Sequence, residues 1–359
     1  MRSMESRYGI LIAVAILAFA VLLPMADADA GDSGYFSYKT QLDENGLLVY
    51  KEVANATAVN DPSKEFTVEF SNLMFYGYET EEKAKAYANH TVQNALAAAY
   101  YSNPMVAYLW DYPVKQIEVN TTVEKVDVTS DTGTNTYYRA VKVTFTLTVP
   151  EGITSDSMKE LDEAIKSFTV TGDTDADKVT NIMSYLDKLV YQKDEEGKIS
   201  NIYSALVLKK TTSAGIAQAF LQYCVLNNIP AIMVAGDNIT ASDETKSFWN
   251  YVYLEGDHDG ETYYSWYIVD PTYNVSAGIC GYQTMIEYDG NSYSMSAALV
   301  TDLDLSSDND LTTPQVNDKK YMRVGGPTFL EMHGEKVMLA ALGVVLVVGM
   351  LYAVRSGNF

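Results

Sequence analysis

The sequence predicts an α+β fold in which helices pack on antiparallel β-sheets. Apolar residues at helical spacing mark four segments, 80–101, 155–168, 173–190 and 213–226. Runs rich in Val, Thr and Tyr come in neighbouring pairs, 114–128 with 136–149 and 248–254 with 263–269. Paired runs joined by short turns are typical of hairpins, so the sheets are expected to be antiparallel. A hydrophobic content of 47% is enough for a packed core.

Residues 31–150 are expected to form an N-terminal α+β region that begins with β-structure. Strand-like composition marks 47–53 and 65–70, with the turn signal Asn-Asp-Pro-Ser between them. Thr80 is the expected N-cap of the first long helix, which Pro104 ends. The two long strands that follow are expected to form a ribbon around a turn at 129–135.

Residues 151–300 are expected to form a second domain, in which helices precede a sheet. Ser155 or Asp156 caps the first helix, and a short helix at 203–208 precedes the helix that opens at Ser213. A strand at 231–235 and the hairpin around Gly256–Gly260 complete the expected sheet.

The N-terminus has the pattern of a secretory signal peptide over residues 1–30. Arg2 and Arg7 are basic, the apolar run 10–23 follows, and small residues around Ala28 offer a cleavage site. Fourteen apolar residues are too few to span a bilayer comfortably, so we expect cleavage rather than an uncleaved anchor.

The C-terminus predicts a membrane anchor. Residues 337–354 form an unbroken run of 18 apolar or small residues, about 27 Å long as a helix. We expect a transmembrane helix over 336–354, an external domain before it and a short cytoplasmic tail at 355–359. The Asp- and Ser-rich residues 301–335 are expected to form an acidic stalk or a peripheral wrap that leads to the anchor.

The charge and the motifs exclude several classes of function. With a formal net charge of −22, the surface repels nucleic acid, so no nucleic-acid partner is expected. The run Asp173-x-Asp175-x-Asp177 imitates a calcium loop but lacks the Gly and Glu that an EF-hand requires. No metal cluster, phosphate loop or dinucleotide motif is visible, and no cofactor is expected.

Three blocks carry the strongest functional signal: TTSAGIAQAF at 211–220, KSFWNYVYL at 246–254 and SWYIVDPTYN at 265–274. Together they resemble a transglutaminase-like domain of the secreted bacterial and archaeal type, which has a papain-like core. The resemblance, which covers about 100–295, implies a helix that opens with the catalytic residue and packs on an antiparallel sheet. It also implies a Cys-His-Asp triad, in which the thiolate attacks an amide, the His moves a proton and the Asp orients the His.

Two of the three triad positions have changed in this chain. Ser213 stands where the family has Cys, Ser247 stands where it has His, and only Asp270 is retained. Cys224 lies about 16 Å further along the helix from Ser213, so it cannot replace the thiol. Without a thiolate or an imidazole, the resemblance implies a degenerate active site.

Alternatives remain open for these residues. Ser213 is either a helix N-cap or a nucleophile with a base such as Lys209 or Lys210. Asp270 either caps the turn after its strand or bonds Ser247. The remaining candidates are aromatic or amide residues of the same blocks, and each either binds a ligand in the cleft or packs in the core. They are Asn250, Trp249, Trp266 and Tyr273.

The chain has two Cys and five glycosylation sequons. In an oxidising exterior, a disulfide between Cys224 and Cys280 is expected, with two buried thiols as the alternative. The sequons fit a glycosylated ectodomain, and they lie at Asn55, Asn89, Asn120, Asn238 and Asn274.

The sequence therefore predicts a prokaryotic, plausibly archaeal surface protein on the cell membrane, held by one helix. Its transglutaminase-like domain is expected to be inactive and to bind an envelope protein or glycan, or to support the cell envelope. Two alternative functions remain open. One is a peptidase or acyltransferase that uses Ser213, and the other is a purely structural surface-layer component.

Overall fold

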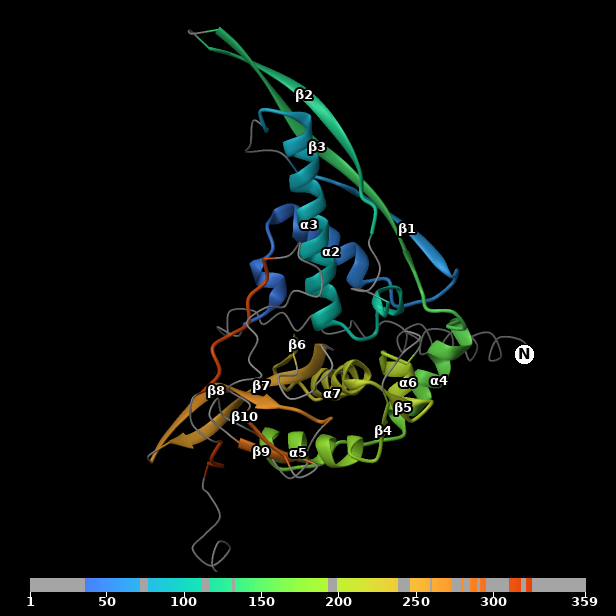
Figure 1. Ribbon diagram of the computed structural model, residues 1–359, viewed down its shortest axis with the longest axis vertical. Coiled ribbons are helices and arrows are strands. Elements are labelled where there is room, and N and C mark those ends of the chain that lie inside the picture. Colours follow the sequence, from blue (N-terminus) through green and yellow to red (C-terminus); the bar gives the residue numbers. More distant parts are fainter. Residues whose placement is uncertain are drawn as a thin grey trace, which may run out of the picture.

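The computed structural model describes residues 36–71, 77–111, 117–130, 133–192, 199–237, 246–258, 260–272, 279, 285–288, 291–294, 310–317 and 321–324. These residues form two halves, each with a helix packed on a three-stranded antiparallel sheet (Figure 1). The α+β class and the antiparallel pairing predicted from the sequence are confirmed.

The N-terminal half contains one long helix and one long sheet. Its elements are η1 (Tyr38–Gln41), α2 (Glu44–Ala54), β1 (Ser63–Glu69), α3 (Glu81–Ser102), η2 (Ala107–Leu109), β2 (Asn120–Ser130) and β3 (Gly133–Thr148). The strand order is β1-β3-β2, and α3 contacts both β2 and β3. Figure 1 shows the β2–β3 ribbon extending beyond the rest of this half.

The predicted strand at 47–53 is wrong, because these residues belong to helix α2. Val49 and Val53 are fully buried one turn apart, which is helical spacing. The Asp43 side chain caps the helix by accepting a hydrogen bond from the Gly46 amide at 2.7 Å. The helix cap just before this segment therefore outweighed its strand-like composition.

Two other predictions for this half hold within two residues. The side chain of Thr80 caps α3, as expected, by accepting from the Lys83 amide. Strand β1 matches the run predicted at 65–70. The expected turn at 129–135 is wrong in length, because Ser130 still pairs with Gly133 across the ribbon.

The C-terminal half carries the smaller helices and a second sheet. Its elements are α4 (Ser155–Lys166), α5 (Asp175–Leu186), β4 (Val190–Tyr191), α6 (Ile202–Leu206), β5 (Lys210–Thr211), α7 (Ser213–Leu226), β6 (Ala231–Asp237), β7 (Lys246–His258), β8 (Glu261–Val269), β9 (Met285–Tyr288) and β10 (Asn291–Ser294). Helix α7 has the predicted bounds and packs on the β6-β7-β8 sheet. Thr154, rather than Ser155 or Asp156, caps α4 through a capping box.

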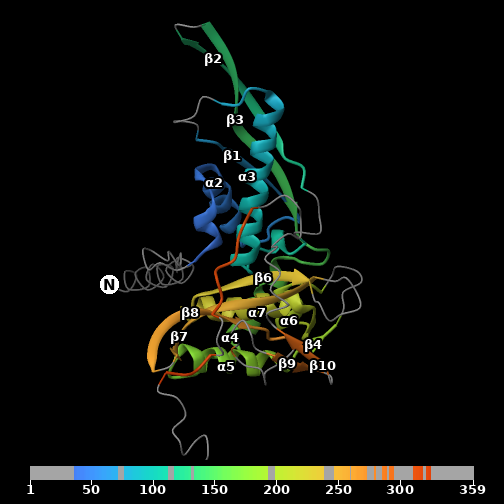
Figure 2. The ribbon, with the colours of Figure 1, turned by 60° about the vertical axis from the view of Figure 1, so that its left-hand side comes forward.

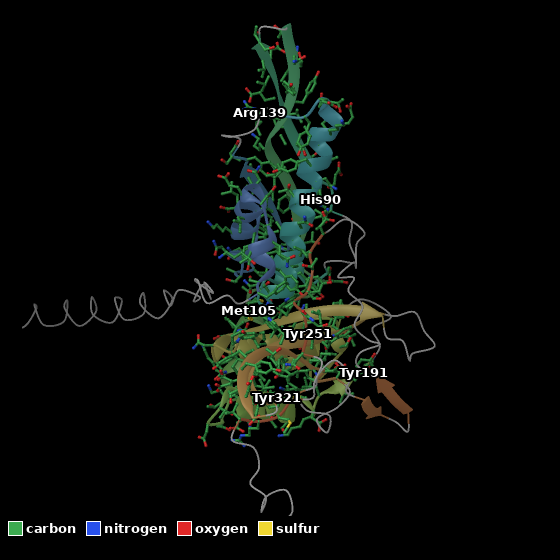
Figure 3. All side chains as sticks on the ribbon, turned by 90° about the vertical axis from the view of Figure 1, so that its left-hand side faces the viewer. His90, Met105, Arg139, Tyr191, Tyr251 and Tyr321 are labelled. Atoms are coloured by element: carbon green, nitrogen blue, oxygen red, sulfur yellow. The ribbon has the colours of Figure 1, made fainter. Side chains whose placement is uncertain are left out.

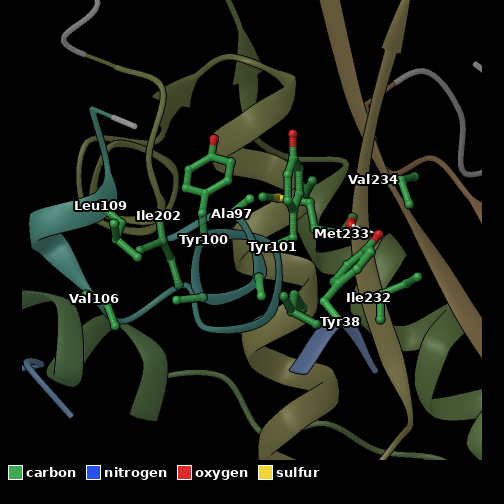
Figure 4. Packing of buried hydrophobic residues seen from close by; sticks show 14 of the residues in the cluster. Tyr38, Ala97, Tyr100, Tyr101, Val106, Leu109, Ile202, Ile232, Met233 and Val234 are labelled. Carbon is green, nitrogen blue, oxygen red and sulfur yellow. Dashed lines mark hydrogen bonds between the residues drawn. The ribbon is translucent and has the colours of Figure 1, made fainter. Parts of the chain in front are cut away.

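The two halves share one hydrophobic core. The Tyr38 hydroxyl donates to the Met233 carbonyl of β6 at 2.9 Å, and the Tyr38 and Tyr101 rings lie 5.8 Å apart. Figure 4 shows these rings, with Tyr100 beside them, at the boundary between α3 and the second sheet. The C-terminal end of α3 is therefore fixed against β6 and β7.

The predicted signal peptide (1–30), transmembrane helix (336–354) and tail (355–359) lie outside the described residues. Within the described ranges, no helix is both long and apolar enough to cross a membrane.

Candidate functional site

Ser213 lies at the start of α7, buried against strand β7. Its side chain is 5% exposed, and its Oγ accepts a hydrogen bond from the Phe248 amide at 3.2 Å. Thr212 occupies the N-cap position, so the alternative in which Ser213 is the N-cap is wrong. Ser213 instead connects the first turn of the helix to the sheet.

The strand register brings the other two candidate positions to the same corner. Ser247 directly precedes Phe248 on β7 and pairs with Gly236 of β6. Val269, the last residue of β8, pairs with Asn250, so Asp270 follows the strand at the level of Trp249. Ser247 therefore lies next to the residue that bonds Ser213, and Asp270 follows the end of the neighbouring strand.

Asp270 has a structural role in this corner. Its Oδ1 accepts a hydrogen bond from the Thr272 amide at 2.9 Å, which stabilises the turn after β8. This is the turn-capping arrangement that the sequence offered as one alternative. The side chain of Ser247 lies outside the described atoms, so a bond between Asp270 and Ser247 stays a prediction.

Gly215 allows the first turn of α7 to approach the loops before it. A Cβ at this position would lie 2.0 Å from Thr211 Oγ1 and 2.5 Å from the Asn201 carbonyl oxygen. Real Cβ atoms do not approach so closely, so a side chain here forces the backbone to move. The Gly of the S-A-G motif is therefore explained by close packing of α7 against the start of α6.

A buried polar network supports this contact, and sequence analysis missed it. Gln218, 1% exposed, accepts a hydrogen bond from the Ile202 amide at 2.9 Å. Thr211 and Ser204 join through their hydroxyls at 3.0 Å, and both are buried. The signal that could have revealed it is a Gln in an otherwise apolar helix, because such a residue needs a buried partner.

Three of the four predicted binding residues are buried in the core. Asn250 is fully buried, and its Nδ2 donates to the Ala217 carbonyl of α7 at 3.1 Å. Trp249 and Trp266 are 2% and 6% exposed, while Tyr273 lies outside the described residues. In this structure the first three are packing residues, and a ligand contact by any of the four stays a prediction.

The described His and Lys residues that could serve as a general base contact residues other than Ser213. His90 lies on α3, where its Nε2 is 2.9 Å from Asp310 Oδ2, and Figure 3 places it in the other half from Tyr251 of β7. The Lys209 ammonium donates to the Tyr185 hydroxyl at 3.3 Å, and Lys210 is exposed. None of these contacts involves Ser213.

Two buried tyrosines next to the sheet have a raised pKa. Burial, followed by the neighbouring Tyr251, raises the pKa of Tyr38 well above its usual range. Burial likewise raises the pKa of Tyr251, and the Trp249 side chain opposes this rise. Both phenols therefore stay protonated at neutral pH.

Cys224 has no exposed surface, and it forms no disulfide with another residue in the described ranges. Burial raises the pKa of the Cys224 thiol well above its usual range, so the thiol remains protonated. Its expected partner Cys280 lies outside the described residues, and the disulfide stays a prediction.

Three of the five predicted glycosylation sites are within the described ranges. Asn55 and Asn120 are exposed and Asn89 is half-buried, whereas Asn238 and Asn274 lie outside those ranges. In the part of the chain that the structure describes, no group of three or more His, Cys, Asp or Glu is placed to hold a metal ion.

A comparison with known protein families gives a match within the C-terminal half. Residues 162–271 match the family model of the transglutaminase-like superfamily. No curated protein gives a significant match to the chain.

Solved structures with similarity to the chain include a TGase, with 14% identity and a TM-score of 0.26 over 61% of this chain and 54% of that protein. A putative cysteine protease from Cytophaga hutchinsonii has 12% identity and a TM-score of 0.26 over 51% of this chain and 71% of that protein. The chain spans about half the length of the TGase, and TM-scores this low carry no argument about function. The family model and the three sequence blocks agree, and the chain therefore carries a transglutaminase-like domain at residues 162–271.

Proposed function

We propose that this chain is a membrane-anchored extracellular protein whose transglutaminase-like domain no longer catalyses a reaction. The domain serves binding or support of the cell envelope. The observation that carries this proposal is the buried Ser213, whose hydroxyl is hydrogen-bonded to the strand at the position where the family has its nucleophile.

The chemistry of the family requires a thiolate, which a neighbouring His helps to form. A serine hydroxyl is far less acidic than a thiol, so it needs a strong local base to become a nucleophile. The side chain of Ser247 is not an imidazole. His90 lies on α3 and is paired with Asp310. The retained Asp270 caps a turn, a role that needs no catalytic partner.

The N-terminal half also covers this corner. The Tyr100 ring of α3 packs edge-on against Phe248 at 6.3 Å, and Tyr100 is 3% exposed. Phe248 is the residue whose amide bonds Ser213. A polypeptide substrate could reach Ser213 from this side only after α3 had moved, which favours a role without turnover.

The membrane anchor and the external location are supported by the sequence at the two ends. The pattern over 1–30 favours export, and the 18 apolar residues at 337–354 are long enough for one membrane helix. Flotation of the full chain with lipid vesicles tests this part, and a chain that stays with the soluble fraction contradicts it.

The catalytic part is tested with purified protein and glutamine- or peptide-containing substrates. We expect no amine incorporation and no peptide cleavage above the level of Ser213→Ala. Ser157→Ala, which removes another buried Ser hydroxyl, serves as the matched control for stability. Turnover that Ser157→Ala retains and Ser213→Ala abolishes would identify a serine-dependent enzyme instead.

A further inference from the structure

Residues 310–317 and 321–324, here called the strap, connect the two halves. At the upper end, the Gln41 side chain of η1 both donates to and accepts from Thr312, at 3.0 and 2.9 Å. Asp310 bonds His90 and Asn94 of α3, at 2.9 and 3.0 Å. Figure 2 shows the strap, in orange-red, running from beside α3 to the second sheet.

The lower part of the strap bonds both outer edges of the β7–β8 ribbon. Val316 forms a parallel bridge with Trp266 of β8, and the Asn317 amide donates to the Trp266 carbonyl at 2.8 Å. On the opposite edge, the Asp257 amide of β7 donates to the Met322 carbonyl at 2.8 Å.

Two side chains hold the final described residues. The Tyr321 ring lies 5.0 Å from the Tyr267 ring, and its hydroxyl donates to the Glu255 carbonyl at 3.1 Å. Arg323 forms an ion pair with Asp177 of α5 at 2.9 Å. The chain therefore leaves the described structure beside the free end of the β7–β8 ribbon.

These contacts shorten the segment that can separate the domain from a membrane. A free stalk over residues 301–335 would have 35 residues and a reach of about 120 Å. With the strap in place, only the 11 residues 325–335 separate Val324 from the predicted transmembrane helix, and they reach at most about 40 Å.

The N-terminal half lies on the other side of the molecule. Helix α3 has 22 residues, which is about 33 Å, and its C-terminal end is the end that packs on the second sheet. Strand β3 has 16 residues and extends about 53 Å toward the tip of the ribbon with β2. Figures 1 and 2 both show that tip at the opposite end of the molecule from the strap's exit.

Exposed aromatic and apolar side chains lie on both faces of this end of the ribbon and on the strap. Tyr263 and Tyr264 of β8 are 41% and 52% exposed, and Met322 and Val324 of the strap are 58% and 38% exposed. Tyr263 and Tyr264 are neighbours on β8, so their side chains point to opposite faces, and the strap lies nearby because Tyr321 bonds the carbonyl of Glu255, the residue that pairs with Tyr264. Tyrosine and apolar side chains at one end of a domain suit the interface between water and lipid.

We propose that the strap fixes the orientation of the molecule on a bilayer, with the free end of the β7–β8 ribbon against a zwitterionic lipid surface and the β2–β3 tip furthest from it. The inference rests on the membrane anchor proposed above. Among the described residues at this end, Glu255 and Glu261 are exposed and Arg323 is paired with Asp177, so these charges favour zwitterionic over anionic headgroups. The β2–β3 tip is then the part of the protein first met by an approaching partner.

Energy transfer to labelled lipids tests the orientation in the full chain. Thr262→Cys, at the end of the β7–β8 ribbon, and Thr134→Cys, near the β2–β3 tip, are both exposed positions. Each is placed in a chain with Cys224→Ala and Cys280→Ala, labelled with a donor and reconstituted into phosphatidylcholine vesicles that carry an acceptor lipid. We expect several-fold more transfer from the Thr262 position.

Two further comparisons strengthen the test. The variant Tyr321→Ala with Arg323→Ala removes the lower contacts of the strap, and we expect it to reduce the difference between the two labels. Vesicles with anionic lipid are expected to lower transfer from the Thr262 position.

The outcomes separate the two proposals. Equal transfer from both labels, or more from Thr134, in a chain that floats with the vesicles overturns the orientation and leaves the anchor intact. A chain that does not float overturns the anchor, and the orientation with it.

Discussion

Both halves of the molecule pack a helix on a three-stranded antiparallel sheet, but they use the start of that helix differently. Helix α3 begins one residue after Thr80, an exposed residue whose side chain caps the helix. Helix α7 begins one residue after Thr212, which makes no side-chain cap, and buries Ser213 against β7. The same layer arrangement therefore gives an ordinary helix start in one half and a polar corner in the other.

The difference shows what a site of this kind needs beyond the fold. A helix on a sheet is a general packing solution, and it carries no chemistry by itself. The corner in the C-terminal half exists because Gly215 permits close approach and because β7 begins beside the start of α7, next to the end of β8. Once that geometry was present, the residues at its positions determined whether the corner was catalytic.

The largest expected effect on stability comes from adding a side chain at Gly215, where the backbones approach closely. In Gly215→Ala, the new Cβ meets Thr211 and the Asn201 backbone, so we expect a loss of at least about 3 kcal/mol in unfolding free energy. Gly260→Ala is the control, since a Cβ there meets nothing within 4 Å and only the backbone at φ +86° is strained, at about 1 kcal/mol. Urea denaturation measures both, and equal losses would contradict the close approach.

A buried Asn in each half provides the next comparison. Asn250 bonds the Ala217 carbonyl, and Asn45 bonds Tyr87 and the Ser71 amide. Each change to Ala leaves a buried partner unsatisfied, and we expect a loss of about 1–3 kcal/mol in unfolding free energy at either site. If Asn250→Ala were neutral in stability but abolished binding of an envelope ligand, Asn250 would be a binding residue rather than a packing one.

A tyrosine with a raised pKa makes each half less stable at alkaline pH. Burial, together with the Asp43 carboxylate that accepts from its hydroxyl, raises the pKa of Tyr87 to about 12. The unfolded chain then loses this proton near pH 10 while the folded chain keeps it, so stability is full below pH 10 and falls as the pH rises toward 12.

Tyr87→Phe removes this contribution and should flatten the decline of unfolding free energy between pH 10 and 12. Tyr251→Phe, the counterpart in the other half, should flatten it too, because burial raises the pKa of Tyr251. Denaturant titrations at three alkaline pH values measure the slopes. An unchanged slope in Tyr87→Phe would show that the phenol is not buried as described.

The smallest expected effect concerns the upper end of the strap. Gln41→Ala removes the bonds to Thr312, which are exposed, so we expect a change below about 1 kcal/mol in global stability. Hydrogen exchange of the Thr312 amide should nevertheless become faster, while amides in α7 remain unaffected. Slow exchange in the variant would mean that other contacts hold the strap.

Much of the fold could be predicted because the signals were local. The periodicity of α7 and the Thr80 cap of α3 appear within a few residues of sequence, and both predictions hold. The segment 47–53 misled because Leu, Val and Tyr suit strands, whereas the deciding residue, Asp43, lies before the segment. The cap therefore outweighed the local composition.

The elements that carry Ser213 and Asp270 were predictable, but the contacts of these residues were not. The S-A-G motif and the D-P-T motif placed Ser213 and Asp270 on the correct elements. The Phe248 amide that bonds Ser213, and the Tyr100 ring that covers Phe248, come from other parts of the chain. Such contacts depend on how the two halves pack, and the pattern of a single segment does not encode that.

The claim that the Ser213 corner is not catalytic is tested most directly by its reactivity. The folded full chain is treated with a fluorophosphonate that labels activated serines, and peptides are analysed by mass spectrometry. Because the Ser213 hydroxyl is buried and bonded to the Phe248 amide, we expect no adduct at this residue. Labelling of Ser213 in the folded protein, lost on denaturation and absent in Ser213→Ala, would contradict this account.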